Sequence, residues 1–416
     1  MRIKPRQNLN SIVKLSGSKS YTNRALMIAA LCHGTSTLID PLISDDTLHM
    51  ITALRALGAG IKPIKGKVVI TGVTLHPPLK PLFVGNSGTT ARFLTALAGL
   101  VSGTTIITGD VHMQKRPLTD LLSALQQLGI RVESKTGCPP VIIEGGSFVG
   151  GTCKLSGTTS SQYLSAILMV APYADTDVKI VVQGELTSKP FVDVTIDVMK
   201  KFGVKVQNNN YRTFVVKGSQ HYTPRKYIIE PDMTAASYFF AAPALAGGKV
   251  TVDGINLQTK QGDIGFVQVL KRMGCQVTQG KTSITISKKK QLKAITLDMN
   301  KMPDVVQTLA AVSLFAQGTT HIQNIENLRV KETNRIESTA TELRKLGAVV
   351  GTTKSSITIQ PPQKIKTPTS IETYSDHRMA MSFALVGLAV PHISIKDPRC
   401  VNKTFPDFWK MLAKLK

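Results

Sequence analysis

The sequence predicts an α/β protein of two domains, each built from three βαβαββ units. Three observations lead to this fold class. The chain has 416 residues, too many for one ordinary hydrophobic core and enough for two domains of about 200 residues. A helix-ending motif occurs five times, and a small-residue apolar helix followed by a strand occurs six times. Neither a helix nor a sheet buries its own apolar face, so the layers of each domain must cover one another.

A glycine marks each helix end in the first motif. The strings are LRALGAG, LQQLGIR, MKKFGVK, LKRMGCQ and LRKLGAV, and their glycines are Gly58, Gly129, Gly203, Gly274 and Gly347, spaced 71, 74, 71 and 73 residues apart. A glycine after an apolar-periodic run is the usual signal for the end of a helix. The nearly constant spacing indicates repeated units, and a sixth copy begins near the C-terminal string FWKMLAKLK.

The second motif is an apolar helix rich in small residues, such as RALMIAAL or RMAMSFALVGLA, followed by a strand. The strand that leads into the helix also repeats, as KLSGS at 14–18 and KLSGT at 154–158. Each unit is expected to run strand, helix, strand, helix and then a strand pair such as 61–72. The apolar stretch 379–395 contains Pro391 and His392, and we expect a buried helix and a strand there rather than a membrane span.

Composition indicates a globular protein with an anionic partner. Hydrophobic residues make up 42% of the chain, and the formal net charge is +25. Such a basic excess attracts polyanions, acidic membranes or anionic metabolites, and composition alone does not choose among them. The single Trp and 13 Phe offer little material for stacking the bases of single-stranded nucleic acid.

The five cysteines are scattered, odd in number and without a CxxC pair, so neither a disulfide framework nor a zinc site is expected. Reduced cysteines fit a cytoplasmic protein. The N-terminal string MRIKPRQNLNSIVKLSG lacks the apolar core of a signal peptide, which also favours the cytoplasm.

Polar and basic residues concentrate where the helices are expected to begin. The strings before the first helices of the units are SKSYTNR, NSGTTAR, TTSSQ, PDMTAAS, MPDVVQ and YSDHR; those before the second helices are SDDT, KRPLTD, SKPFVD, QGD, RVKETNR and KTFPD. Helices of equivalent units run parallel, so these N-termini should gather at one face of each domain. Their free N–H groups and partial positive charge favour anions. Lysines and arginines there oppose the helix dipole, and a bound anion is the expected reason for them.

Taken singly, each string has a purely structural explanation. Glu332 and Arg335 could pair at i, i+3 on a solvated helix face, and Asp304 could cap a helix. A lone histidine such as His377 is more often structural than catalytic.

Taken together and in order, eight strings resemble the 5-enolpyruvylshikimate-3-phosphate synthases. They are SGSKSYTNRAL, GNSGTTARF, KRP, SSQYLSA, SKPFVD, RVKETNR, YSDHRMAM and KTFPD, and the resemblance extends from about Lys14 to Phe408. It implies a two-domain inside-out α/β barrel in which each domain has three βαβαββ units around buried parallel helices. The implied domains are 1–17 with 230–416, and 18–229, with the active site in the interdomain cleft.

The resemblance also implies an activity, which is transfer of the enolpyruvyl group of phosphoenolpyruvate to the 5-hydroxyl of shikimate 3-phosphate with release of phosphate. The positions implied for phosphoenolpyruvate are Lys19, Asn86, Gly88, Arg116, Gln162, Arg335, Arg378 and Lys403. Those implied for shikimate 3-phosphate are Lys19, Ser20, Arg24, Ser160, Ser161, Gln162, Ser188, Asp304, Asn327 and Lys331. The implied catalytic residues are Asp304 and Glu332, the acid/base pair, together with Lys19.

This chemistry agrees with the residue types. Arginine grips carboxylate and phosphate groups bidentately. Addition and elimination require one group that takes the hydroxyl proton and another that gives and recovers the proton on carbon. No step requires a metal or organic cofactor, and we expect none. One position departs from the family, because Phe191 stands where a tyrosine is common.

Two other functions compete with this interpretation. The sister transferases that act on a UDP-aminosugar carry a reactive cysteine in the loop corresponding to GDVHMQKRP, and this loop has none. A nucleic-acid-binding repeat protein would carry basic stripes with interleaved aromatic residues, whereas these basic residues sit among Ser, Thr and Asp. The expected partners are therefore small anionic substrates, without nucleic acid or membrane, and the chain is expected to be a monomer.

Overall fold

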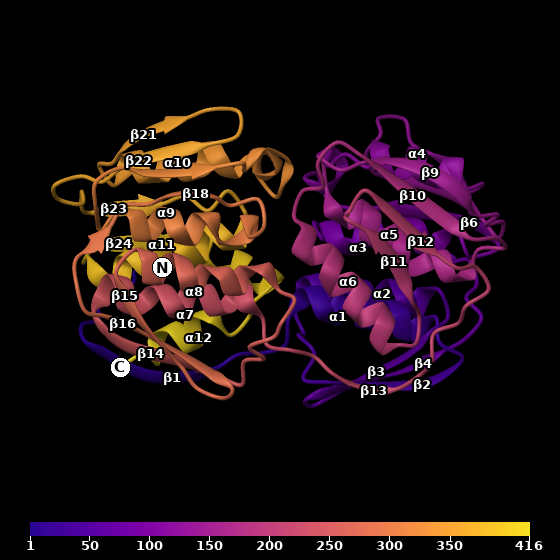
Figure 1. Cartoon of the computed structure of the whole chain (residues 1–416), viewed down its shortest axis with the longest axis horizontal. Coiled ribbons are helices and arrows are strands. Elements are labelled where there is room, and N and C mark those ends of the chain that lie inside the picture. The colour runs from indigo at the N-terminus through magenta and orange to yellow at the C-terminus, as the bar shows by residue number, and fades with distance from the viewer. The chain divides into compact units, whose positions relative to one another are not determined.

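The computed structural model describes residues 1–416 and divides into two compact units (Figure 1). The N-terminal unit is Gly17–Glu230, and the C-terminal unit combines Met1–Ser16 with Pro231–Lys416. Both units mix helices and sheets, so the fold is the α/β type that the repeats predict.

Three four-stranded sheets, of orders β13-β2-β4-β3, β5-β6-β8-β7 and β9-β10-β12-β11, build the N-terminal unit. In each sheet the first pair is parallel and the remaining pairs are antiparallel. The parallel pairs β5-β6 and β9-β10 are βαβ crossovers, and each of the three sheets ends in a hairpin. The strands are β2 (Gly34–Ile39), β3 (Gly60–Ile64), β4 (Lys67–Gly72), β5 (Leu82–Phe83), β6 (Gly103–Thr108), β7 (Arg131–Glu133), β8 (Val141–Gly145), β9 (Gly151–Ser156), β10 (Val178–Gln183), β11 (Val206–Asn209), β12 (Thr213–Val216) and β13 (Lys226–Ile228).

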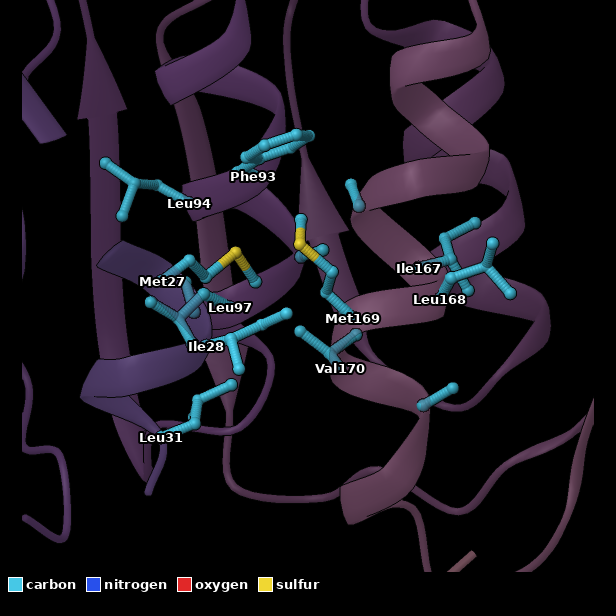
Figure 2. Close-up of a cluster of buried hydrophobic side chains, with 14 of the residues drawn as sticks. Met27, Ile28, Leu31, Phe93, Leu94, Leu97, Ile167, Leu168, Met169 and Val170 are labelled. Carbon is cyan, nitrogen blue, oxygen red and sulfur yellow. The ribbon is translucent and has the colours of Figure 1, made fainter. Parts of the chain in front are cut away.

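The six α-helices of this unit fall into two classes. They are α1 (Lys19–Ala30), α2 (Asp45–Ala56), α3 (Gly88–Ala98), α4 (Thr119–Gln127), α5 (Ser161–Val170) and α6 (Lys189–Lys201). The small-residue helices α1, α3 and α5 are buried nearly all round, and every residue of α3 is buried. Figure 2 shows their apolar side chains, among them Met27, Phe93 and Met169, facing one another. By contrast, α2, α4 and α6 bury one face only, the usual pattern of a surface helix.

The C-terminal unit contains two four-stranded sheets, β1-β14-β16-β15 and β18-β20-β22-β21, and two strand pairs, β17-β19 and β23-β24. Its strands are β1 (Leu9–Lys14), β14 (Gly248–Asp253), β15 (Cys275–Gln279), β16 (Ser283–Lys288), β17 (Leu292–Lys293), β18 (Thr296–Asp298), β19 (Ala316–Gln317), β20 (Thr320–Gln323), β21 (Val349–Thr352), β22 (Ile357–Gln360), β23 (Thr369–Ile371) and β24 (Ile393–Ile395). Its α-helices are α7 (Met233–Ala246), α8 (Phe266–Arg272), α9 (Val306–Ser313), α10 (Arg335–Lys345), α11 (His377–Ala389) and α12 (Phe408–Ala413).

Two strands lie far along the chain from the sheets that they complete. Strand β1 pairs in parallel with β14, with Leu9 opposite Gly248 and Lys14 opposite Asp253. Strand β13 pairs in parallel with β2, from Lys226 opposite Thr37 onward. In each unit, therefore, one edge strand pairs with a strand from which it is separated along the chain by most or all of a domain.

The sixth unit corrects one expectation. It contains β23, α11, β24 and α12, and lacks the terminal strand pair of the predicted βαβαββ pattern. The expected buried helix and strand within 379–395 are confirmed as α11 and β24. None of the helices combines the length and hydropathy needed to span a membrane.

Candidate active site

The starts of three helices of the C-terminal unit, α9, α10 and α11, meet in a buried network centred on Arg335, the first residue of α10. Its guanidinium donates from Nε to Asp376 Oδ2 at 2.7 Å and from Nη2 to Glu332 Oε2 at 2.7 Å. A third bond joins Nη1 to Asp304 Oδ1 at 3.1 Å. Only 2% of the Arg335 side chain is exposed, so three carboxylates fix the orientation of this fork.

Asp304 connects Arg335 to a second arginine. It lies in the 3₁₀ turn Pro303–Val305, which leads into α9. Its other oxygen, Oδ2, accepts a hydrogen bond from Arg378 Nη2 at 2.7 Å. Asp376 in turn caps α11, because its Oδ1 accepts the backbone N–H of Arg378 at 2.9 Å. The starts of α9, α10 and α11 are thereby joined through charged groups.

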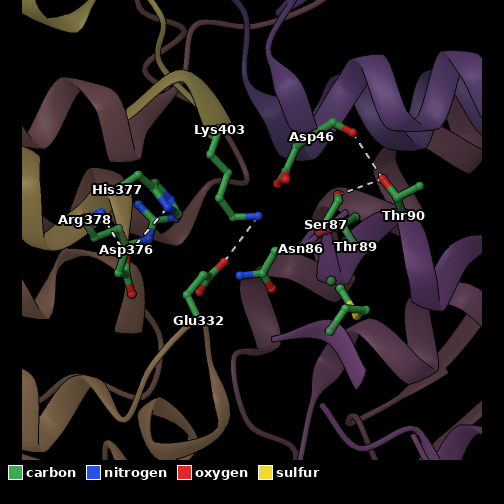
Figure 3. Close-up of polar contacts among 12 residues, drawn as sticks. Asp46, Asn86, Ser87, Thr89, Thr90, Glu332, Asp376, His377, Arg378 and Lys403 are labelled. Atoms are coloured by element: carbon green, nitrogen blue, oxygen red, sulfur yellow. Dashed lines mark hydrogen bonds and ion pairs between the residues drawn. The ribbon is translucent and has the colours of Figure 1, made fainter. Parts of the chain in front are cut away.

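Glu332 lies between two cations. Besides Arg335, it faces Lys403, whose Nζ is 3.7 Å from Glu332 Oε1 (Figure 3). Lys403 ends the 3₁₀ segment Pro398–Lys403. Both side chains are largely buried, 8% and 11% exposed, which weakens solvent screening of the pair.

The electrostatics of these arginines follow from their partners. Burial disfavours the charged guanidinium of Arg335, but Asp376 and Glu332 outweigh it and the pKa of Arg335 is raised. Burial acts on Arg378 in the same way, and Asp304 likewise raises the pKa of Arg378. Burial lowers the pKa of His377 well below its usual value, and nearby Arg378 adds to this effect, so the imidazole is neutral.

The N-terminal unit holds a comparable set of polar groups at its own helix starts. Lys19, the first residue of α1, pairs with Asp46 of α2 through Nζ and Oδ2 at 3.3 Å. The Asp46 carbonyl accepts a hydrogen bond from Thr90 at 3.1 Å, and Thr90 shares a 2.8 Å hydrogen bond with Ser87 at the start of α3 (Figure 3). These contacts tie α1, α2 and α3 together.

Arg116 lies against the start of α3. Its Nη1 donates to Asn86 Oδ1 at 3.2 Å and to the Asn86 carbonyl at 3.3 Å. A Cβ atom at Gly88 would lie 2.6 Å from Arg116 Nη2 and 2.4 Å from Arg92 Nη1. Glycine at this position therefore lets two guanidinium groups approach the helix N-terminus.

Arg24 differs from the arginines of the C-terminal unit. It is 1% exposed, and its acceptors are neutral: Thr195 Oγ1 at 2.7 Å, the carbonyls of Ser20 and Phe191 at 2.9 and 3.0 Å, and Ser165 Oγ at 3.3 Å. These bonds account for four of the five N–H groups of a guanidinium. Burial without a carboxylate lowers the pKa of Arg24 to about 9.

The other predicted residues occupy the expected helix starts. Ser160 caps α5 by accepting the N–H of Gln162 at 3.3 Å, and Gln162 Nε2 donates to Thr89 Oγ1 at 3.3 Å. Ser188 precedes α6 with a left-handed φ of 56°. Asn327 lies in the 3₁₀ segment Glu326–Val330, and Lys331 follows it directly.

The sequence argument did not single out three carboxylates of these networks. Asp376 holds Arg335, Asp46 holds Lys19, and Asp263 lies buried near Asp304 with its Oδ2 accepting from Thr234. Asp376, Asp46 and Asp263 occur in the helix-start strings YSDHR, SDDT and QGD, respectively. In the sequence each looks like an ordinary helix-capping residue, and only its neighbours in space show its other contacts. No group of three or more His, Cys, Asp or Glu residues is arranged to hold a metal ion.

Comparison with known proteins identifies the family. The model of the family described as EPSP synthase (3-phosphoshikimate 1-carboxyvinyltransferase) matches residues 3–412. The 3-phosphoshikimate 1-carboxyvinyltransferases of Shewanella pealeana and Escherichia coli O1:K1 are each 44% identical to this chain, covering all of it and 99% and 98% of their own lengths. A solved EPSP synthase from Acinetobacter baumannii superposes with a TM-score of 0.82 at 27% identity, covering 99% of this chain and 97% of its own. The chain belongs to the EPSP synthase family.

Proposed function

We propose that this chain transfers the enolpyruvyl group of phosphoenolpyruvate to the 5-hydroxyl of shikimate 3-phosphate, the reaction catalysed by its family. The observation that carries the proposal is Asp304, a carboxylate held between Arg335 and Arg378, with Glu332 bound to the same Arg335. Two arginines suit the anionic groups of phosphoenolpyruvate, and two carboxylates suit two separate proton transfers.

In the first step, the 5-oxygen forms a bond to C2 of phosphoenolpyruvate, its proton leaves, and C3 gains a proton. We assign the 5-hydroxyl proton to Asp304 and the C3 proton to Glu332, with Lys19 as a further candidate. In the second step C3 returns a proton, the double bond reforms, and the bond from C2 to the phosphate oxygen breaks. Cations around the departing phosphate stabilise its negative charge.

The contacts of Asp304 suggest how substrate binding prepares this base. Asp304 pairs with both Arg335 and Arg378 and neutralises part of their buried positive charge. An arriving carboxylate or phosphate offers both guanidinium groups another anion. Asp304 would then be less strongly held and better able to accept a proton.

Residues of both units are proposed to bind the substrates. For phosphoenolpyruvate they are Lys19, Asn86, Gly88, Arg116, Gln162, Arg335, Arg378 and Lys403. For shikimate 3-phosphate they are Lys19, Ser20, Arg24, Ser160, Ser161, Gln162, Ser188, Asp304, Asn327 and Lys331. The buried charge of Arg24, which meets only neutral acceptors, supports a role beside an anion.

The finer architecture is part of the same proposal. The helices α1, α3 and α5, buried nearly all round, and the repeated order of the sheets support the inside-out barrel expected for the N-terminal unit. We further propose a cytoplasmic monomer that works without a cofactor and without nucleic acid, with the two domains 1–17 with 230–416 and 18–229.

Phosphate release from phosphoenolpyruvate tests the proposal. Release is expected with shikimate 3-phosphate and not with UDP-N-acetylglucosamine. Equal release with the sugar nucleotide would move the chain to the sister branch, and no release with either acceptor would overturn the proposal.

A further inference from the structure

Glu342 is a fully buried carboxylate two turns along α10 from Arg335. Its exposed fraction is 0%. Oε1 accepts from the Tyr374 hydroxyl at 2.7 Å, and Oε2 accepts from the backbone N–H of Glu372 at 3.0 Å. Lys345 Nζ contacts both oxygens, at 2.8 and 2.9 Å. A buried charge is unfavourable unless it is paired and hydrogen-bonded, and this one has donors on both oxygens.

The segment that Glu342 holds has an unusual backbone. Tyr374 and Ser375 have φ values of 54° and 55°, so two consecutive residues other than glycine adopt the left-handed conformation. Such residues persist only where their surroundings enforce the conformation. The residue after this turn is Asp376, which binds Arg335 and caps the helix that carries Arg378.

Helix α10 therefore contacts one short segment at two points. Arg335 binds Asp376 at the start of the helix, and Glu342 binds Glu372 and Tyr374 from seven residues further on. Residues seven apart lie on the same face of an α-helix. The two contacts thus fix both the position and the backbone conformation of 372–376 against α10.

We propose that Glu342 and Tyr374 are positioning residues for phosphoenolpyruvate, holding the 372–376 turn so that Asp376 aligns Arg335 and presents Arg378. This inference rests on the proposed function. Neither residue touches the substrate in this scheme. Burial, together with the hydrogen bond to Glu342, raises the pKa of Tyr374, so its hydroxyl remains a donor throughout the working pH range.

Tyr374→Phe tests the proposal because it removes one hydroxyl and keeps the ring. Losing the bond loosens the turn and misaligns both arginines, which contact the substrate in its ground state and transition state alike. KM for phosphoenolpyruvate should rise by about five- to twenty-fold, while kcat and KM for shikimate 3-phosphate change by less than about threefold. Glu342→Gln keeps the shape of the side chain but replaces one acceptor oxygen with an NH₂ group, which is itself a donor and faces other donors. This variant should also raise KM for phosphoenolpyruvate.

Tyr211→Phe is the matched control. Tyr211 also donates to a carboxylate, Asp193 Oδ1, at 2.8 Å, but it lies in the N-terminal unit. This control should leave KM for phosphoenolpyruvate unchanged. Melting temperatures recorded for all variants separate general destabilisation from misalignment, because kinetics measured well below melting report only folded enzyme.

A double-mutant cycle with Arg378→Lys identifies the route of the effect. If Tyr374 acts through Arg378, the fold-increase in KM of the double variant should be smaller than the product of the fold-increases of the two single variants. A wild-type KM in both folded variants, Tyr374→Phe and Glu342→Gln, would overturn the inference even with an active parent enzyme. A parent enzyme that releases no phosphate would instead overturn the proposed function, and the inference with it.

Discussion

Arg335 donates two hydrogen bonds to Asp376, from Nε to Oδ2 at 2.7 Å and from Nη2 to Oδ1 at 3.2 Å. This bidentate pair joins the first residue of α10 to the cap of α11. Asp376 is 0% exposed and is therefore beyond solvent screening. Asp376 occupies the edge of the guanidinium formed by Nε and Nη2. Nη2 also donates to Glu332, and Nη1 donates to Asp304.

Asp376→Asn should destabilise the protein. The variant keeps the shape of the side chain but leaves part of the Arg335 charge uncompensated in a buried position, which typically costs about 3–5 kcal/mol. Urea unfolding of the variant and the parent measures the loss. Glu326→Gln, which breaks an exposed pair with Lys354, should leave the free energy of unfolding nearly unchanged. Equal effects of the two substitutions would show that the buried pair contributes no more to the free energy of unfolding than the exposed pair.

Asp304→Asn and Glu332→Gln should each lower kcat by about 10²–10⁴-fold, because both preserve shape and remove proton transfer. Substrate KM values should change much less. The control is Glu337→Gln, on the same helix as Arg335, which alters a half-exposed pair with Arg329 and should retain normal kcat. Near-normal kcat in either active-site variant would reassign that residue to a structural role.

Asp263 should make stability depend on pH. Burial, with a further contribution from Asp304, raises its pKa to about 7. Because the carboxyl pKa is raised, the folded state binds more protons than the unfolded state between about pH 4 and 7. The contribution of Asp263 to the free energy of unfolding therefore falls as the pH rises through that range. Asp263→Asn removes this titrating group. The unfolding free energy of the variant minus that of the parent should therefore be about 2–3 kcal/mol larger at pH 8 than at pH 5. A difference independent of pH would show that Asp263 is already ionised at pH 5.

Phe191→Tyr should restore the hydroxyl that is common in the family. Phe191 lies in the first turn of α6, and its carbonyl accepts a hydrogen bond from Arg24. A new hydrogen bond of roughly 0.5–1.5 kcal/mol should lower KM for shikimate 3-phosphate by about 2- to 13-fold and leave kcat nearly unchanged. If the hydroxyl finds no partner, the melting temperature falls and KM does not improve. A drop in kcat would contradict both outcomes.

The sequence by itself determined the features that depend on neighbours along the chain. Apolar periodicity and the recurring glycines predicted the helices, as at α2, which ends before Gly58, and the hairpins, as at β3 and β4. Helix starts such as those before Arg335 and Arg378 were predictable because capping residues and glycines act locally. Eight ordered strings then sufficed to recognise the family.

Only the tertiary structure decided which distant groups meet. No local pattern pairs Leu9 with Gly248, and none places Asp304 between Arg335 and Arg378. The buried setting of Arg24 was likewise beyond the sequence, since a helix-start arginine looks the same whether it meets solvent, a carboxylate or neutral oxygens. The physical reason is that helix and turn preferences arise within a few residues, whereas burial and charge pairing depend on segments brought together by folding of the whole domain.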